Sequence, residues 1–98
     1  MKIIQDLSDM IEEEILDAQK YARCYLAYKE DDPELSRTFS MLSQAELGHV
    51  EMLHTQVVRL IRAFRESKGD PPPNMLAIYE YLHKRHIDKV SEVKLMLS

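Results

Sequence analysis

The stretch Glu30-Asp31-Asp32-Pro33 interrupts a chain whose apolar residues recur at helical spacing on both sides of it. An aspartate side chain can accept hydrogen bonds from the free amide groups at the start of a helix, and proline suits the first helical position. We therefore expect one helix to end just before this stretch and a second helix to begin at Pro33. Two helices joined by so short a turn form an antiparallel hairpin.

A second interruption, Gly69-Asp70-Pro71-Pro72-Pro73-Asn74, separates the hairpin from the C-terminal part of the chain. Glycine can end a helix, three consecutive prolines cannot continue one, and Asn74 is the expected cap of the helix that follows. The sequence thus predicts three helices, over about residues 3–29, 33–68 and 75–97. The expected fold is all-α, a single domain over residues 1–98 made of a long hairpin plus a third helix.

Each predicted helix carries an apolar stripe with steps of three and four residues. In the first helix the stripe comprises Ile4, Leu7, Ile11, Glu14, Ala18, Tyr21, Tyr25 and Tyr28. In the second it comprises Leu35, Phe39, Leu42, Glu46, His49, Leu53, Gln56, Leu60 and Ala63. A second apolar face of that helix comprises Leu47, Val50, Val57, Val58 and Ile61. In the third helix the stripe comprises Tyr79, Leu82, His86, Val90, Val93 and Leu97.

The two apolar faces of the middle helix indicate that it has neighbours on two sides. A helix over residues 33–68 would be about 50 Å long, which is too long for a compact monomer of this size. A chain of 98 residues also buries a small core, and oligomerisation is the usual remedy. We therefore expect a homodimer or a ring of dimers.

The composition excludes several classes of function. The net charge of −4 disfavours nucleic acid as a partner, because nucleic acid attracts concentrated positive charge. No apolar run approaches the roughly 20 residues that span a bilayer, and the first residues lack a secretory signal, so we expect a cytosolic protein. Cys24 is the only cysteine, which excludes an internal disulfide and a rubredoxin-type cysteine site.

Three polar residues, Glu14, Glu46 and His49, lie in stripe positions where leucine or isoleucine would pack best. Removing a carboxylate from water without a partner costs several kcal/mol. Glu46 and His49 are three residues apart on one helical face, so both can reach one cation, and Glu14 could face them from the first helix. Carboxylate and imidazole ligands suit iron, manganese or zinc. The alternative is a hydrogen-bonded polar layer that sets the register of the helices.

The pattern Glu-x-x-His occurs three times, as Glu46/His49, Glu51/His54 and Glu80/His83. Only the first pair lies wholly in an apolar stripe, because Glu51 is about 140° around the helix from Glu46 and the third pair flanks its stripe. For His86, within the stripe of the third helix, we expect a hydrogen-bonded core histidine. A site built within one chain from Glu80, His83 or His86 remains the alternative geometry.

The segment Gln44-Ala45-Glu46-Leu47-Gly48-His49-Val50-Glu51-Met52-Leu53-His54 resembles the second helix of ferritin-like proteins, especially rubrerythrins and encapsulated ferritins. Glu14 matches the single glutamate on the first helix of those families. Ferritin-like carboxylate proteins place one glutamate on each of two helices and Glu-x-x-His on each of two others. The resemblance implies that one chain supplies half of this set. A dimer would complete a four-helix bundle that holds two iron ions, with manganese or zinc as other candidates.

The resemblance also implies ferroxidase activity, the oxidation of Fe(II) by oxygen at a site shared by two subunits. Glu46 would bridge the metal ions, and Glu14 and His49 would be terminal ligands. Tyr21 resembles the tyrosine beside such sites, although ordinary packing also explains it. An encapsulating shell protein is implied as a partner, but residues 91–98 do not resemble the targeting peptide of such cargo. The alternatives are a metal-binding module without turnover and a metal-free, structural or partner-binding helical oligomer.

Overall fold

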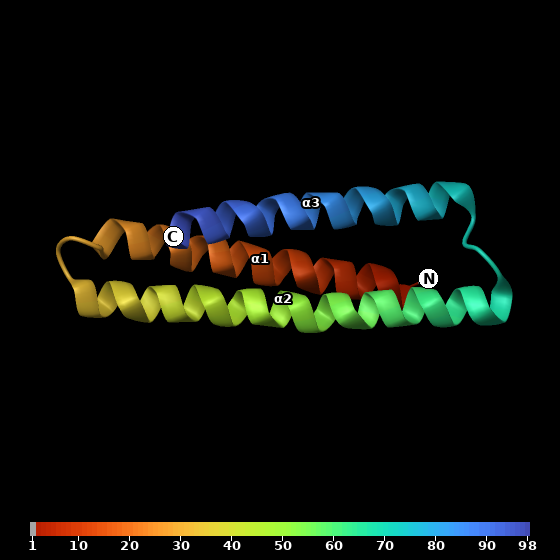
Figure 1. Ribbon diagram of the computed structural model, residues 1–98, viewed down its shortest axis with the longest axis horizontal. Helices are drawn as coiled ribbons and strands as arrows, with labels where there is room; N and C mark the ends of the chain where they lie inside the picture. The colour runs from red at the N-terminus through yellow and green to blue at the C-terminus, as the bar shows by residue number, and fades with distance from the viewer. Residues whose placement is uncertain (1) are drawn as a thin grey trace.

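A computed structural model describes residues 2–98, which form three helices and no strand. Helix α1 spans Lys2–Tyr28, α2 spans Pro33–Lys68 and α3 spans Pro73–Leu97. Helix α2 runs antiparallel to α1 and α3, and the molecule is a rod of 55 × 18 × 18 Å (Figure 1). The predicted all-α architecture, a long hairpin plus a third helix, is confirmed.

The two ends of α2 have the local chemistry that the sequence predicts. At its start the Asp32 carboxylate accepts a hydrogen bond of 3.1 Å from the backbone N–H of Leu35, and Pro33 is the first helical residue. At its end the backbone N–H of Gly69 donates to the carbonyl of Arg65 at 3.0 Å. Gly69 has φ = +81°, which glycine adopts readily because it lacks a Cβ atom.

The start of α3 differs from the expectation. Pro72 is the capping residue and Pro73 the first helical residue, so Asn74 lies within the first turn and the cap predicted there is wrong. The physical reason is that proline has a fixed φ suited to a helix and lacks an N–H that the first turn would leave unbonded. The carbonyl of Pro72 accepts the first helical hydrogen bond, from the N–H of Leu76 at 3.0 Å.

Replacing Asp32 with alanine tests the cap of α2. The substitution leaves the N–H of Leu35 without its side-chain acceptor, and we expect it to lower the free energy of unfolding by about 1 kcal/mol. Urea denaturation followed by circular dichroism measures the change. Asp31→Ala is the matched control, since it removes a neighbouring exposed carboxylate that is not the helix cap. Equal losses for the two variants would contradict the assignment of the cap.

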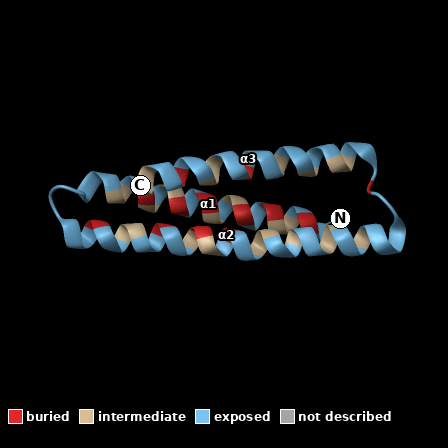
Figure 2. Ribbon diagram, viewed as in Figure 1, coloured by how far each residue is buried: buried red, intermediate tan, exposed pale blue. Residues whose placement is uncertain are grey.

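Helix α1 is the centre of the bundle, because it packs against both α2 and α3. Its buried side chains are Ile4, Ser8, Ile11, Ile15, Ala18 and Ala22. They recur at steps of four and three and form the longest row of buried positions in Figure 2. Leu47 and Val50 of α2 and Val93 of α3 close the core around them.

Small residues bring α1 and α2 close together toward the turn that joins them. The hydroxyl of Ser43 is fully buried and donates to the carbonyl of Ala18 at 2.7 Å. The hydroxyl of Ser36 donates to the carbonyl of Tyr25 at 3.1 Å. Each serine thus fills little space and satisfies its own polar atom on the facing helix, which permits the close packing of the hairpin.

The two apolar faces of α2 have different surroundings in the structure. The face with Leu47 and Val50 is the one buried against α1. The other face, which contains the predicted stripe with Leu35 and Leu42, borders solvent. The side chains of Leu35 and Leu42 are 37% and 40% exposed. The single chain therefore buries one face of α2 and leaves much of the other uncovered.

The buried residues of α1 also differ in part from the stripe that the sequence predicts. Ile4, Ile11 and Ala18 are buried as expected, but Ile15 and Ala22 take core positions that the predicted stripe omits. The reason is that the hairpin contact is centred about one residue to the side of the predicted stripe. Its remaining members thereby fall at the edge of the core. The stripe of α3 is confirmed, since each of its six members is buried or half-buried.

Among residues 2–98, no helix has the combination of length and apolar character that crossing a bilayer requires.

Candidate metal centre

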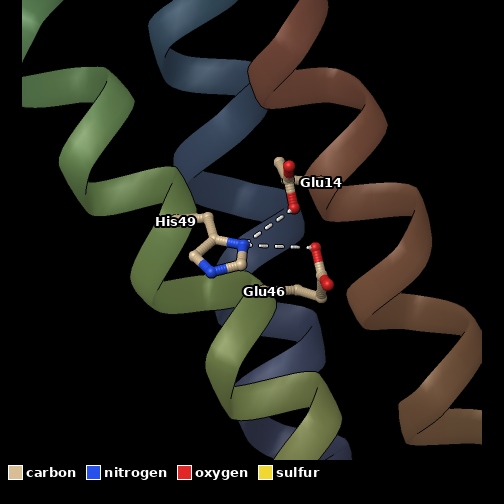
Figure 3. Close-up of side chains that lie close together, drawn as sticks. All are labelled: Glu14, Glu46 and His49. Atoms are coloured by element: carbon tan, nitrogen blue, oxygen red, sulfur yellow. Dashed lines mark hydrogen bonds and ion pairs between the residues drawn. The ribbon is translucent and has the colours of Figure 1, made fainter.

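The three side chains singled out in the sequence converge at the edge of the α1–α2 contact. Glu14 extends from α1, while Glu46 and His49 extend from successive turns of α2 (Figure 3). The Nδ1 atom of His49 lies 3.3 Å from Oε2 of Glu14 and 3.6 Å from Oε2 of Glu46. One imidazole nitrogen thus faces a carboxylate from each helix.

This cluster is compact and partly open to solvent. One ligand atom from each residue lies within 4.8 Å of the other two. The side chains of Glu46 and Glu14 are 19% and 29% exposed, and that of His49 is 52% exposed. Within residues 2–98 this is the one set of three or more Asp, Glu, His or Cys side chains close enough to share an ion. The spacing of the donor atoms therefore fits a cation that enters from the uncovered side.

The chemistry of the cluster favours positive charge. Two carboxylates and one imidazole offer oxygen and nitrogen lone pairs, and the carboxylates attract a divalent cation. When Nδ1 carries a proton, His49 can donate a hydrogen bond to Glu14 instead. The same nitrogen could bind either a proton or a metal ion, so an ion bound there would take the place of this hydrogen bond.

Tyr21 lies two helical turns beyond Glu14, about 10 Å further along α1. It is half-buried, and its ring stacks on that of Phe39 with a centroid separation of 6.4 Å and an interplanar angle of 25°. Packing thus supplies one reason for an aromatic residue here. A role for Tyr21 beside the metal cluster remains a prediction.

A second polar cluster, centred on Glu12, joins α1 to α3. The Glu12 carboxylate contacts Nε2 of His86 at 3.1 Å, the Arg85 guanidinium at 3.2 Å and the Lys89 ammonium at 3.8 Å. Burial raises the pKa of the Glu12 carboxyl, but the hydrogen bond and charge of Arg85, with the charges of Lys89 and His86, outweigh burial and leave this pKa below its ordinary value. His86 is the hydrogen-bonded core histidine that the sequence predicts.

A histidine pair joins α2 to α3. Nε2 of His54 lies 2.9 Å from Nδ1 of His83, and the two rings stack at 4.5 Å with an interplanar angle of 13°. Sequence reasoning named His83 as a possible ligand of a site within one chain, but it missed the pairing of His83 with His54 and the role of Glu12. Glu12 belongs to an acidic run in which no residue stands out, and the two histidines belong to Glu-x-x-His patterns that each lie outside an apolar stripe. Only the docking of α3 brings these side chains together.

Two histidines of this region, the half-buried His54 and the buried His86, have lowered pKa values, which favours their neutral form. Burial lowers the pKa of the His54 imidazole, and the charges of His83 and His86 lower it further. Burial also lowers the pKa of His86, and the Arg85 and His83 charges add to this effect, although Glu12 offsets part of it. Both groups therefore bind a proton more readily in the unfolded chain than in the folded one.

Acidification is accordingly expected to destabilise the docked third helix. Neutral His54 and His86 stabilise the folded state, and this stabilisation is fully present above their ordinary pKa of 6.5. It is lost as the pH falls from 6.5 through the lower pKa values that the two groups have in the folded state. We expect a lower melting temperature at pH 5.5 than at pH 7.5, measured in the presence of a chelator. His54→Gln should reduce this difference, and an unchanged or larger difference would contradict the prediction.

Comparisons with protein-family models, with curated proteins and with solved structures find no match for this chain. The case for a metal centre therefore rests on the contacts between Glu14, Glu46 and His49 and on the chemistry of their donor atoms.

Proposed function

We propose that this chain is a ferritin-like iron-binding protein with ferroxidase activity, and that two copies of the chain share its di-metal site. The observation that carries the proposal is the convergence of Glu14, Glu46 and His49 from two helices, with their ligand atoms within 4.8 Å of one another. This convergence agrees with the ligand pattern of the ferritin-like carboxylate proteins, in which helices of a bundle supply single glutamates and Glu-x-x-His pairs.

The donor set fits iron better than calcium, magnesium or a structural zinc ion. Two carboxylates and one imidazole per chain suit the borderline-hard ions iron, manganese and zinc, whereas calcium and magnesium prefer oxygen ligands alone. Structural zinc sites in proteins usually have cysteine and histidine ligands around a closed tetrahedron. Here the ligands are mainly carboxylates, and the cluster is open to solvent on the side of His49.

Two features support a second copy of the chain as the partner. One chain supplies three ligands, which is too few to enclose an ion, and a two-fold axis beside the cluster would supply six. The site also borders the uncovered apolar face of α2, which includes the exposed side chains of Leu35 and Leu42. Pairing two hairpins across this face would cover both sets of apolar side chains and complete a four-helix bundle around the ligands.

The proposed reaction takes two Fe(II) ions as substrate. Each ion loses one electron, and one O₂ molecule accepts both electrons and two protons to give hydrogen peroxide. Four carboxylates, Glu14 and Glu46 from each copy, stabilise Fe(III) more than Fe(II) because the product carries the greater positive charge. Glu46 would lie between the two ions, with Glu14 and His49 as terminal ligands. A role for Tyr21, which lies about 10 Å beyond Glu14 along α1, is a further element of this proposal.

A second candidate function is a metal-free helical oligomer in which these residues form a polar layer. The observation that favours it is the contact of 3.3 Å between Nδ1 of His49 and Glu14, which satisfies both groups without an ion. A metal-binding module without turnover is intermediate between the two candidates. It would hold iron, manganese or zinc at the same ligands without consuming oxygen.

Metal counting and oxygen chemistry separate these candidates. Protein purified with a chelator is titrated with Fe(II) without oxygen, and the bound iron is counted against the mass of the oligomer. Two iron ions per two chains are expected. Air is then admitted, and the near-ultraviolet absorbance of Fe(III) and the oxygen concentration are followed. Bound iron without oxidation above buffer would reduce the function to metal binding, and no bound iron would leave the metal-free oligomer.

The substitution Leu42→Asp tests the shared site. A charge on the uncovered face of α2 should oppose pairing of two hairpins, so we expect the mass in light scattering to halve and Fe(II) oxidation to fall toward the buffer rate. Leu95→Asp on α3 is the matched control, since Leu95 is 76% exposed and lies on another helix. A Leu42→Asp protein that keeps both its oligomeric mass and its oxidation rate would contradict a site shared through this face.

A further inference from the structure

The histidine pair of α2 and α3 has the geometry of two neighbouring metal ligands. Metal–imidazole bonds are about 2.0–2.1 Å long, so two nitrogens bound to one ion at a right angle lie about 2.9 Å apart. Nε2 of His54 and Nδ1 of His83 are 2.9 Å apart. An ion beside the line that joins them could bind both nitrogens in place of the shared proton, at a right angle without a change in their separation or, at the tetrahedral angle that Zn²⁺ prefers, after they move to about 3.4 Å apart.

The surroundings of the pair can hold an ion and its remaining ligands. His54 and His83 line a pocket of about 420 Å³ between the helices, whose lining residues on α2 and α3 continue from this pair toward the connection of the two helices. Glu80 and His86 line the same pocket. They lie three residues before and after His83, on the same side of α3 as that residue. Glu80 and His86 do not lie close enough to share an ion with the pair, so water in the pocket would complete the coordination.

Other charged groups of the pocket lie away from the histidines. Arg62 and Arg65 also line it, but they follow His54 by eight and eleven residues, about 12 and 16 Å along α2. Among the charged residues that line the pocket, Glu80 is the one closest to the pair along the chain, three residues before His83. The remaining wall is largely apolar, with Ile4, Val57, Ile61 and Leu76 among its residues. The end of the pocket at the histidines thus has nitrogen ligands and one nearby negative charge.

We propose that His54 and His83 form a second metal site, one per chain, for a divalent ion that prefers imidazole, such as Zn²⁺, Ni²⁺ or Cu²⁺. The site is distinct from the carboxylate cluster, because His54 lies about 140° around α2 from His49 and about 7.5 Å further along it. Its two protein ligands come from different helices, so the bound ion joins α3 to α2. This site does not depend on the proposed oxidation of Fe(II).

The test uses a protein in which the carboxylate cluster has been removed by Glu46→Ala and His49→Ala. Titration of this variant with Zn²⁺, followed by calorimetry, is expected to show one ion per chain and a rise in melting temperature with Zn²⁺ concentration. Adding His54→Gln or His83→Gln should weaken Zn²⁺ binding by at least about tenfold. Glu66→Gln is the matched control, since Glu66 is exposed, lies twelve residues beyond His54 on α2 and does not line the pocket, and it should leave Zn²⁺ binding unchanged.

Nuclear magnetic resonance of the imidazole nitrogens gives a measurement that leaves the pair intact. In the same Glu46→Ala/His49→Ala protein, Zn²⁺ should shift Nε2 of His54 and Nδ1 of His83, the two nitrogens that face each other. Absence of Zn²⁺ binding in this protein would overturn the second site, as would binding that survives both His54→Gln and His83→Gln. Fe(II) oxidation is measured separately on the unsubstituted chain, so the failure of one proposal is distinguishable from the failure of the other.

Discussion

Replacing Glu46 with glutamine is expected to reduce the rate of Fe(II) oxidation by at least about 100-fold. Loss of a residue that only supports a metal ligand typically costs 10–100-fold in metal affinity or activity, and Glu46 is proposed as a ligand that both ions share. Glutamine keeps the size of the side chain but removes its negative charge and one of its two oxygen donors. The initial rate of Fe(III) formation, measured at equal helix content, checks the effect.

The control for this prediction is Glu51→Gln, the same chemical change one and a half turns further along α2. Glu51 is exposed and lies about 140° around the helix from Glu46, so its substitution should leave Fe(II) oxidation within about twofold of the original rate. Because the two variants have the same net charge, non-specific attraction of iron by an acidic surface predicts equal losses. Equal losses, or an unimpaired Glu46→Gln protein, would refute Glu46 as a ligand.

The helices could be predicted from sequence because their ends depend on local chemistry. Asp32 with Pro33 defines the start of α2, and the positive φ of Gly69 suits its end, so both boundaries could be assigned from neighbouring residues alone. The start of α3 differs from the prediction because proline has two local effects: it cannot continue a helix, yet it fits the first turn of one. The first effect alone points to Asn74 as the cap, whereas the second makes Pro73 the first helical residue.

The residues of the metal cluster could be predicted because each departs from the apolar pattern around it. Glu14, Glu46 and His49 occupy positions where an aliphatic side chain is expected, and such a departure is visible in one sequence. Glu12, His54 and His83 lie outside the apolar stripes, and the Glu-x-x-His patterns that contain the two histidines do not indicate that these side chains meet. Their contacts depend on how α3 packs against the hairpin, which helical periodicity does not determine.

The helical periodicity of apolar residues also does not determine which face of α2 packs against α1 of the same chain. Both faces are apolar at helical spacing, so the pattern gives two solutions, and the packing of small residues decides between them. Ser43 and Ala18 allow a close approach on one side, with a hydrogen bond across the contact. The face with Leu42, Glu46 and His49 consequently lies at the border of the hairpin. This placement gives the cluster access to ions and to a second chain.

The largest effect on stability is expected at Ile15, which is fully buried at the contact of α1 with α2. Replacing it with alanine removes three carbon atoms between Ile11 and Val50 and leaves a cavity, because the surrounding backbone of two long helices can relax only partly. Substitutions of this kind cost about 2–5 kcal/mol. That is a large fraction of the roughly 5–15 kcal/mol that stabilises a typical domain.

Urea denaturation at a fixed protein concentration measures this loss, since the stability of an oligomer also depends on concentration. Leu16→Ala is the matched control: it is the adjacent residue with the same number of carbon atoms, but its side chain is 50% exposed. We expect Leu16→Ala to cost less than about 1 kcal/mol, as surface substitutions do. If the two variants lose equal stability, α1 does not present Ile15 to α2 in the way described. The placement of Glu14 at the border of the contact would then be wrong as well. Glu14 directly precedes Ile15, so the orientation of α1 that buries Ile15 also determines where Glu14 lies.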